Sequence, residues 1–341
     1  MSLKPAQLYC RAMDTAGARW PISWSDVLDA ERRIRPWLPE TPLRNYAPLD
    51  RAVGSDMRVW VKHENHNPTS SFKARNAMSV LSSLPGEVLG RGVLGASRGN
   101  HGQGLAWAGA IVGAPVTVCV PVGNNPEKNE AMRGFGATVI EEGRDYDESV
   151  EVAQRVQREK GLYMVKATDD PLVIAGAATL SLEMLRVRPE IDAIVVAIGG
   201  GSQAVGALTA ARELAPEAAV YGVQAERASA IHDSWHAGRP VTRESADTFA
   251  DGLATRQSYA LTFPTLLEGL AGFVTVTEAE IAAAVRLVLS TTHNLVEGAG
   301  AAGLAGLRRL ARELAGREVA VILSGGNIDA ETLRRVITRE L

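Results

Sequence analysis

The chain alternates between short apolar runs and longer segments of helical composition. The apolar runs predict strands at residues 59–63, 92–97, 116–121, 137–142, 163–167, 193–199, 219–225, 273–277 and 319–324. Helices are predicted between most of them, at residues 145–160, 171–187, 203–215, 278–290 and 301–315. This alternation is typical of α/β proteins, in which helices cover both faces of a parallel sheet.

The distribution of these elements predicts two doubly wound domains with parallel sheets. Residues 85–165 form a compact succession of strand and helix units, whereas residues 166–341 are longer and richer in glycine. We therefore expect a small α/β domain at 85–165, inserted into a large domain made of residues 1–84 and 166–341. The active site is expected in the cleft between the two domains.

Composition and charge narrow the class of protein. The 341 residues are 46% hydrophobic and 22% charged, and 36 basic against 39 acidic residues give a net charge of −3. The sequence has no stripe of basic residues of the kind that binds nucleic acid. It also has neither a secretion signal nor an apolar run long enough to span a membrane. Cys119 lies in an apolar run, and Cys10 is the only other cysteine. We therefore expect reduced thiols and a cytoplasmic protein.

A lysine, Lys73, stands at the start of a predicted helix, directly after the turn Asn67-Pro68-Thr69-Ser70-Ser71-Phe72. Ser70 or Ser71 is expected to cap this helix, which places Lys73 in the first turn. The positive end of the helix dipole disfavours an ammonium group there, so we expect the amine to lose its proton readily. Such lysines serve as nucleophiles or Schiff-base partners, and an ordinary surface lysine is the alternative.

A glycine loop follows the predicted strand that ends near residue 199. The loop consists of Gly199, Gly200, Gly201, Ser202 and Gln203. Because it opens a helix, its backbone N–H groups can hold a phosphate. The loop also fits the G-x-G-x-x-A pattern of nicotinamide dehydrogenases, with Glu226 as the ribose-binding acid, and this alternative stays open. A literal G-x-G-x-x-G at residues 298–303 follows a poor strand, so we interpret it as close helix packing.

Two further polar loops, at residues 97–104 and 324–329, also follow predicted strands. The first opens a helix, and its donors can hold a carboxylate or a cofactor oxygen. The second ends at an aspartate that can cap the next helix. A lysine at a helix start, a phosphate loop and two polar loops at strand ends share one explanation, the cofactor pyridoxal 5'-phosphate. Its aldehyde requires the lysine, its phosphate requires the glycine loop, and its ring nitrogen requires a partner.

These motifs also carry a family resemblance, which covers roughly residues 25–341. The resemblance rests on the turn before Lys73, the 97–104 loop, the 199–206 loop, Glu297-Gly298-Ala299-Gly300, and Ser324 to Asn327. In this order they resemble the fold type II, or tryptophan synthase beta-like, pyridoxal-phosphate enzymes. Within that family the chain is most similar to the threonine/serine dehydratase and serine racemase branch. The resemblance implies that the cofactor lies in the interdomain cleft and that the protein is a homodimer.

The resemblance also implies roles in cofactor binding. Lys73 would be the Schiff-base lysine and the general base, and Phe72 would pack near the cofactor. Asn100 would bind the ring hydroxyl, Gly199 to Gln203 would surround the phosphate, and Ser324 would meet the pyridine nitrogen.

Substrate contacts follow from the same resemblance. Ser97 and His101 would help to hold the substrate carboxylate. Arg98 stands where the dehydratases usually carry a small residue and the racemase a serine that acts on the opposite face. We therefore do not expect racemisation, and Arg98 either binds a substrate anion or points into solvent. Gln224 stands in place of a glutamate of the racemase branch's divalent-cation site, so we expect no bound metal and little cation dependence.

The implied reaction removes the β-hydroxyl of a small-molecule L-amino acid such as threonine or serine, giving a 2-keto acid and ammonia. A threonine synthase-like enzyme or another fold type II lyase or transferase is the nearest alternative, because Asn67 to Lys73 also resembles that branch. A nicotinamide-dependent oxidoreductase and a non-catalytic amino-acid sensor are alternatives from other classes. Since the chain ends after the last predicted helix, we expect no regulatory domain of the kind found in biosynthetic threonine dehydratases.

Overall fold

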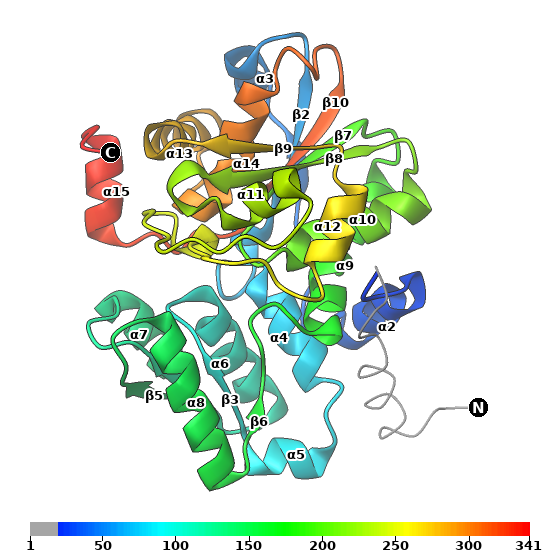
Figure 1. Ribbon diagram of the computed structural model, residues 1–341. Coiled ribbons are helices and arrows are strands. Elements are labelled where there is room, and N and C mark those ends of the chain that lie inside the picture. The colour runs from blue at the N-terminus through cyan, green and yellow to red at the C-terminus, as the bar shows by residue number, and fades with distance from the viewer. Residues whose placement is uncertain (1–19) are drawn as a thin grey trace. The chain divides into compact units, whose positions relative to one another are not determined.

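The computed structural model describes residues 20–341 and divides them into two compact units (Figure 1). The first unit contains the described residues up to Pro39 and Lys73–Ala177; the second contains Glu40–Phe72 and Ala178–Leu341. These bounds differ from the expected ones because helix α4 (Lys73–Leu81) packs against α6 (Asn100–Val112) and so joins the first unit. The chain passes from the second unit to the first directly before Lys73.

A four-stranded parallel sheet forms the centre of the first unit, in the order β5-β4-β3-β6. Its strands are β3 (Val93–Ala96), β4 (Val116–Val120), β5 (Thr138–Glu141) and β6 (Tyr163–Met164). The other helices that begin in this unit are α2 (Trp24–Ile34), α5 (Gly86–Arg91), α7 (Pro126–Gly134), α8 (Tyr146–Lys160) and α9 (Pro171–Val187), which continues into the second unit. Each strand coincides with a predicted one, so the parallel sheet expected here is confirmed.

Helices cover both faces of this sheet. Val93 and Val118 pack into a core shared with α4 and α6, whereas the next residues, Leu94 and Cys119, pack against α8. Burial on both faces explains why these strands are uninterrupted apolar runs in the sequence. The Cys119 thiol is free and buried, which raises its pKa to about 11. It is thus the small buried hydrophobe that was expected, while Cys10 lies outside the described residues.

A six-stranded sheet forms the centre of the second unit, in the order β1-β2-β10-β7-β8-β9. Its strands are β1 (Leu43–Asn45), β2 (Arg58–His63), β7 (Ala193–Ala197), β8 (Ala219–Ala225), β9 (Gly272–Val276) and β10 (Glu318–Leu323). All neighbouring strands are parallel except β1 and β2. The sequence did not predict β1, because its three residues are mostly polar and lie at the edge of the sheet.

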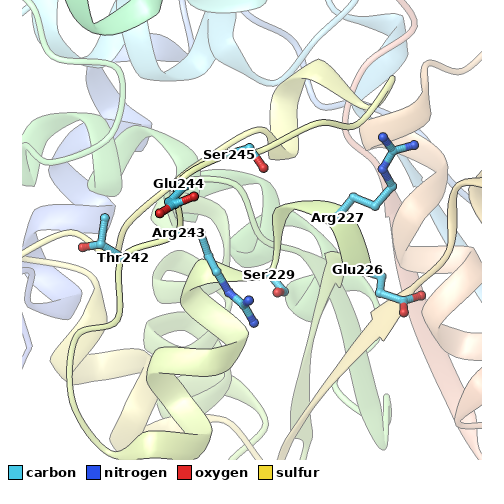
Figure 2. A pocket seen from close by; sticks show the side chains of 7 residues that line it. All are labelled: Glu226, Arg227, Ser229, Thr242, Arg243, Glu244 and Ser245. Atoms are coloured by element: carbon cyan, nitrogen blue, oxygen red, sulfur yellow. The ribbon is translucent and has the colours of Figure 1, made fainter.

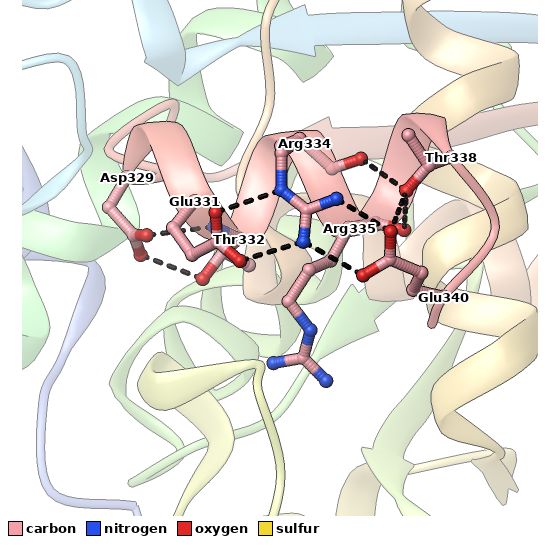
Figure 3. Close-up of polar contacts among 7 residues, drawn as sticks. All are labelled: Asp329, Glu331, Thr332, Arg334, Arg335, Thr338 and Glu340. Carbon is pink, nitrogen blue, oxygen red and sulfur yellow. Dashed lines mark hydrogen bonds and ion pairs between the residues drawn. The ribbon is translucent and has the colours of Figure 1, made fainter.

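Seven of the described α-helices begin within the second unit. They are α3 (Ala47–Val53), α10 (Ser202–Leu214), α11 (Ala230–Ala237), α12 (Phe263–Gly269), α13 (Glu278–Thr292), α14 (Gly298–Arg309) and α15 (Ala330–Ile337). Short 3-10 turns occur at Glu64–His66, Glu226–Ala228 and Asp251–Leu253. The expected aspartate cap is confirmed at α15, where the Asp329 side chain accepts a hydrogen bond from the Thr332 N–H at 2.8 Å (Figure 3). Arg334 then pairs with Glu331 of the same helix and with Glu340, which follows the helix.

The glycines at 298–303 allow α14 to approach its neighbours closely. A Cβ atom on Gly300 would lie 2.5 Å from the carbonyl oxygen of Gly325, and one on Gly303 would lie 3.1 Å from that of Val195. The interpretation of this motif as helix packing is therefore confirmed. Within the part of the chain that the structure describes, no helix has the length and apolar character needed to cross a membrane.

Candidate functional site

The predicted site residues are divided between the two units. The first unit contains Lys73, Ser97, Arg98, Asn100 and His101. The second contains Phe72, Gly199, Gly200, Gly201, Ser202, Gln203 and Ser324. In both units these residues lie at the ends of parallel strands or at the starts of the helices that follow.

Lys73 is the first residue of α4, and its side chain is half-buried. Its Nζ atom donates a hydrogen bond to the carbonyl oxygen of Ala167 at 2.9 Å. Burial lowers the pKa of the amine to about 8, because desolvation disfavours the charged form. From the sequence we expected the helix dipole to lower this pKa, but the shift arises from burial. The amine can therefore lose its proton close to neutral pH and act as a nucleophile or base.

The turn before Lys73 is attached to the loop that follows β10. Ser71 and Gly325 form an isolated antiparallel bridge, and the Phe72 N–H donates to the Ser324 carbonyl oxygen at 3.0 Å. Two motifs that are about 250 residues apart in the sequence are thus joined by backbone hydrogen bonds within the second unit. This attachment fixes the direction in which the chain enters α4.

The expected serine cap of α4 is not present in the form predicted. Helix α4 begins at Lys73, so Phe72 directly precedes it, not Ser70 or Ser71. Ser70 has a φ of 51° in the left-handed region, and its carbonyl oxygen accepts a hydrogen bond from Gly326 N–H at 2.8 Å. The serines therefore serve the attachment of the turn to the 324–327 loop.

A buried polar network, which the sequence analysis missed, supports the other end of this turn. The Lys62 ammonium lies 2.7 Å from the Glu183 carboxylate and donates to the Thr41 carbonyl oxygen at 2.8 Å. The Thr41 hydroxyl donates to Glu64 at 2.6 Å, and Asn67 Nδ2 donates to the same carboxylate at 2.7 Å. The available signal was a lysine inside the predicted strand 59–63 and a glutamate directly after it, because buried charges require partners.

The carbonyl groups of the glycine loop are held by two threonines of the second unit. Thr262 Oγ1 donates to the Gly200 carbonyl oxygen at 2.8 Å, and Thr255 Oγ1 lies 3.5 Å from that of Gly199. A Cβ atom on Gly199 would lie only 2.1 Å from the Gly252 carbonyl oxygen, so no side chain fits there. The loop's carbonyls are thus engaged on the side of residues 252–262.

The start of α10, which follows this loop, offers donors to an anion. Gly201 occupies the N-cap position with a φ of 94°, and it supplies no side-chain cap to the helix. Gln203 is buried, and its Nε2 atom has no hydrogen-bond partner in the described part of the chain. An uncapped helix start beside an unsatisfied amide donor fits the phosphate group expected from the sequence.

Side-chain hydrogen bonds to the backbone hold the loop at residues 97–101 in place. The buried Ser97 Oγ accepts hydrogen bonds from the N–H groups of Gly99 at 3.1 Å and Gly102 at 2.9 Å, so this serine caps the start of α6. His101 is buried, and its Nε2 atom lies 3.1 Å from the Val165 carbonyl oxygen. Because a carbonyl only accepts, Nε2 carries the hydrogen and Nδ1 is a bare acceptor without a partner among the described residues. Burial and the nearby Lys73 charge lower the pKa of His101 to about 3.

Arg98 points its charge into solvent-accessible space. Its side chain is exposed, and it makes no ion pair with any residue between 20 and 341. Its carbonyl oxygen accepts a hydrogen bond from the buried Asn124 side chain at 3.2 Å, which holds the backbone of the loop. Beside it, the Lys128 side chain lies against Gly99, with Nζ 3.9 Å from the position of a Cβ atom there.

Ser324 and Asn100 are the other two residues predicted to contact the cofactor. Ser324 follows β10 directly and is buried, and its hydroxyl makes no hydrogen bond within the described residues. Asn100 is the first residue of α6 and is half-buried. Their assignments to the ring nitrogen and the ring hydroxyl of the cofactor stay predictions.

A pocket of about 410 Å³ lies elsewhere in the second unit (Figure 2). Its lining consists of Glu226, Arg227, Ser229, Thr242, Arg243, Glu244 and Ser245. Arg227 pairs with Asp247, and Arg243 pairs with Asp233. None of the residues predicted to bind pyridoxal phosphate or its substrate lines this pocket, although Glu226, the acid of the nicotinamide alternative, does. Both arginines of its lining are paired with aspartates, so we do not assign the pyridoxal-phosphate chemistry to it.

Comparisons with known proteins agree with the predicted chemistry. Residues 34–325 match the family described as "Pyridoxal-phosphate dependent enzyme". The L-threonine ammonia-lyase of Geobacter sulfurreducens is 39% identical over 94% of this chain and 79% of its own length. The L-threo-3-hydroxyaspartate ammonia-lyase of Pseudomonas sp. is 33% identical over 91% of this chain and 96% of its own. The processed threonine deaminase isoform 2 of Solanum lycopersicum superposes with a TM-score of 0.88 at 30% identity, over 92% of this chain and 87% of that one.

Proposed function

The chain belongs to the family of pyridoxal-phosphate-dependent enzymes, in which it is an ammonia-lyase of fold type II, and we propose that it acts on L-amino acids with a β-hydroxyl group, such as threonine or serine. The observation that carries this proposal is the Lys73 amine, whose pKa is lowered to about 8 by burial at the start of α4. An amine of this kind can hold an aldehyde and can also take a proton from the α-carbon.

Features of both units support the binding of the cofactor. Lys73 would hold its aldehyde, and the 199–203 loop with the start of α10 would hold its phosphate. Ser324 supplies a buried hydroxyl without a partner among the described residues, which suits the ring nitrogen, and Asn100 would bind the ring hydroxyl. Phe72 would pack beside the ring. When bound, pyridoxal phosphate supplies the electron sink that makes the α-proton of an amino acid acidic.

The reaction itself requires a base, a carboxylate site and a leaving group. The free Lys73 amine would take the α-proton, and the electron pair of that bond would form the double bond as the bond between the β-carbon and its oxygen breaks. The departing hydroxide would take the proton back from the Lys73 ammonium, so that water leaves and the amine is restored. The resulting enamine hydrolyses to a 2-keto acid and ammonia. If Ser324 meets the ring nitrogen as proposed, its neutral hydroxyl would not protonate that nitrogen fully, which would favour prompt loss of the β-hydroxyl over transamination. Ser97 caps α6, so its contribution to the substrate carboxylate would lie in positioning the N–H groups of that helix.

A second candidate substrate class is a β-hydroxy amino acid with an additional carboxylate, such as 3-hydroxyaspartate. The exposed Arg98, which has no ion pair in the described chain, favours it, and the Lys128 ammonium lies beside the same loop. An unpaired guanidinium binds a carboxylate in a bidentate manner. The Pseudomonas relative named for that substrate also matches nearly its full length.

One panel of substrates tests both candidates. Ammonia release is measured with L-threonine, L-serine, L-threo-3-hydroxyaspartate and L-phenylserine, using Lys73→Ala as the inactive control. We expect release from at least one of them and none from the control. Binding of pyridoxal phosphate without ammonia release from any substrate would instead favour a threonine synthase-like transferase. Arg98→Ala should raise KM for 3-hydroxyaspartate alone if the second candidate is correct, with Arg91→Ala as the matched exposed control.

Family membership argues against the nicotinamide interpretation of the glycine loop. The G-x-G-x-x-A match at 199–204 belongs to a chain of the pyridoxal-phosphate family, so the nicotinamide oxidoreductase is not retained. We further propose a cytoplasmic homodimer, which rests on the family resemblance and on the expected reduced thiols. Light scattering should then give twice the 36.2 kDa of the chain, and the mass of a single chain would contradict the dimer.

A further inference from the structure

A fully buried glutamine, Gln224, joins three segments of the second unit. It lies near the end of β8, with no exposed surface. Its Oε1 atom accepts hydrogen bonds from the N–H groups of Ile231 at 3.2 Å and His232 at 3.0 Å, in the first turn of α11. Its Nε2 atom donates to Thr255 Oγ1 at 3.3 Å. The amide therefore binds α11 on one side and the 251–256 segment on the other.

The hydrogen bond from Gln224 determines the direction of the Thr255 hydroxyl. An amide nitrogen only donates, so Thr255 Oγ1 must accept from it, and the threonine's own proton is left for another acceptor. The acceptor within reach is the Gly199 carbonyl oxygen, at 3.5 Å. Gly252, from the same segment, packs so closely on Gly199 that a Cβ atom there would lie 2.1 Å from its carbonyl oxygen. The 252–255 segment thus forms the back of the glycine loop.

We propose that Gln224 is a positioning residue for the phosphate loop, which it orients through Thr255. By donating to Thr255, it directs the threonine proton towards the Gly199 carbonyl and keeps that carbonyl on the side away from the phosphate. The loop's N–H groups then remain turned towards the anion without rearrangement on binding. This inference rests on the proposed role of residues 199–203 in phosphate binding.

Gln224→Glu is the most specific variant, because it keeps the shape of the side chain and the oxygen that accepts hydrogen bonds from the N–H groups of α11. A carboxylate cannot donate, so Thr255 would turn its proton towards the new carboxylate and away from Gly199. Thr255→Val removes the hydroxyl at constant shape. Thr209→Val is the matched control, since the hydroxyl of this buried threonine donates to Val205 of its own helix and to no other residue between 20 and 341.

The measurement compares the affinity of the cofactor-free protein for pyridoxal phosphate and for pyridoxal, which lacks the phosphate. Loss of one supporting hydrogen bond should lower the affinity for pyridoxal phosphate about fivefold in either variant and leave the affinity for pyridoxal unchanged. The double variant should lose no more affinity for pyridoxal phosphate than either single variant, because both substitutions act on the Thr255 hydroxyl. Thr209→Val should change neither affinity.

Three outcomes would overturn the inference: an unchanged affinity for pyridoxal phosphate, an equal loss for both ligands, or additive losses in the double variant. The wild-type protein separates this inference from the proposed function. If it does not prefer pyridoxal phosphate over pyridoxal, residues 199–203 are not the phosphate site and both proposals fail. If the wild-type protein does prefer pyridoxal phosphate and the variants behave like wild type, only the proposed role of Gln224 fails.

Discussion

The Nζ atom of Lys73 and the carbonyl oxygen of Ala167 are joined by a 2.9 Å hydrogen bond. This bond holds the amine inside the first unit, where burial lowers its pKa. A carbonyl accepts from both the charged and the neutral amine, so Lys73 can lose its proton without losing this partner. The first two predictions follow from that arrangement.

Replacing Lys73 by alanine should abolish both covalent attachment of the cofactor and turnover. Because the amine would serve as anchor and as base, we expect ammonia release to fall by at least about 10³-fold. The visible absorption of the bound cofactor should be lost as well. Lys166→Ala is a suitable control in the same unit, since this residue is not assigned to the site. Retention of the absorption band in Lys73→Ala would contradict the assignment.

The reactivity of the Lys73 amine should depend on pH with a midpoint near 8. The neutral amine is the nucleophile, so its population grows as the pH rises through the pKa. We therefore expect the rate at which the cofactor-free protein attaches pyridoxal phosphate to rise up to about pH 8 and to level off above it. Stopped-flow absorbance across this pH range would measure the rate. A midpoint near the ordinary lysine value of 10.5 would show that the amine is not desolvated.

His101 should make the protein less stable in mild acid. Its pKa is lowered from 6.5 to about 3, so the unfolded chain binds a proton below pH 6.5 that the folded chain does not. Stability is therefore lost as the pH falls, by roughly 2 kcal/mol at about pH 5 from this group alone. Urea unfolding at about pH 7.5 and about pH 5 should show a smaller difference for His101→Gln than for wild type. An equal difference in both proteins would argue against a buried neutral histidine.

The buried pair of Lys62 and Glu183 predicts a stability pattern that is not additive. Their atoms lie 2.7 Å apart, and both side chains are almost fully buried. Either single replacement, Lys62→Met or Glu183→Leu, leaves a charge without its partner and should cost roughly 3–5 kcal/mol. The double replacement should cost less than either single one. Denaturant unfolding of all four proteins checks this, and simply additive losses would mean that the two charges do not depend on each other.

Removal of divalent cations should leave activity nearly unchanged. Within residues 20–341, no three His, Cys, Asp or Glu side chains are grouped as metal ligands would be. The Gln224 amide oxygen is already used by two backbone N–H groups. We expect ammonia release after dialysis against a chelator to stay within about twofold of the untreated enzyme, because the hydrogen bonds of Gln224 need no ion. A large loss that magnesium restores would overturn this expectation.

The amino-acid sequence by itself predicted the fold class and the family, and it singled out Lys73 as the candidate reactive lysine. Every predicted strand is present. For central strands such as β3, β7 and β10 the reason is that residues buried on both faces of a parallel sheet must be apolar. The glycine loop and the turn before Lys73 could also be recognised in the sequence. A backbone that comes close to an anion or to a neighbouring segment requires glycine or other turn-forming residues at that point of the chain. The short edge strand β1 was missed because it has no such local signature.

Only the tertiary structure decided which groups support these motifs. Ala167, Thr255 and Thr262 act through a carbonyl or a hydroxyl, and nothing in their sequence neighbourhood marks them. The network from Glu183 to Asn67 spans about 120 residues of sequence. Likewise, the packing of α4 on α6 places the unit boundary at Lys73, and burial of the Lys73 amine, which the sequence did not reveal, lowers its pKa. Burial and long-range hydrogen bonds depend on which segments meet in space, and that is decided only when the chain folds.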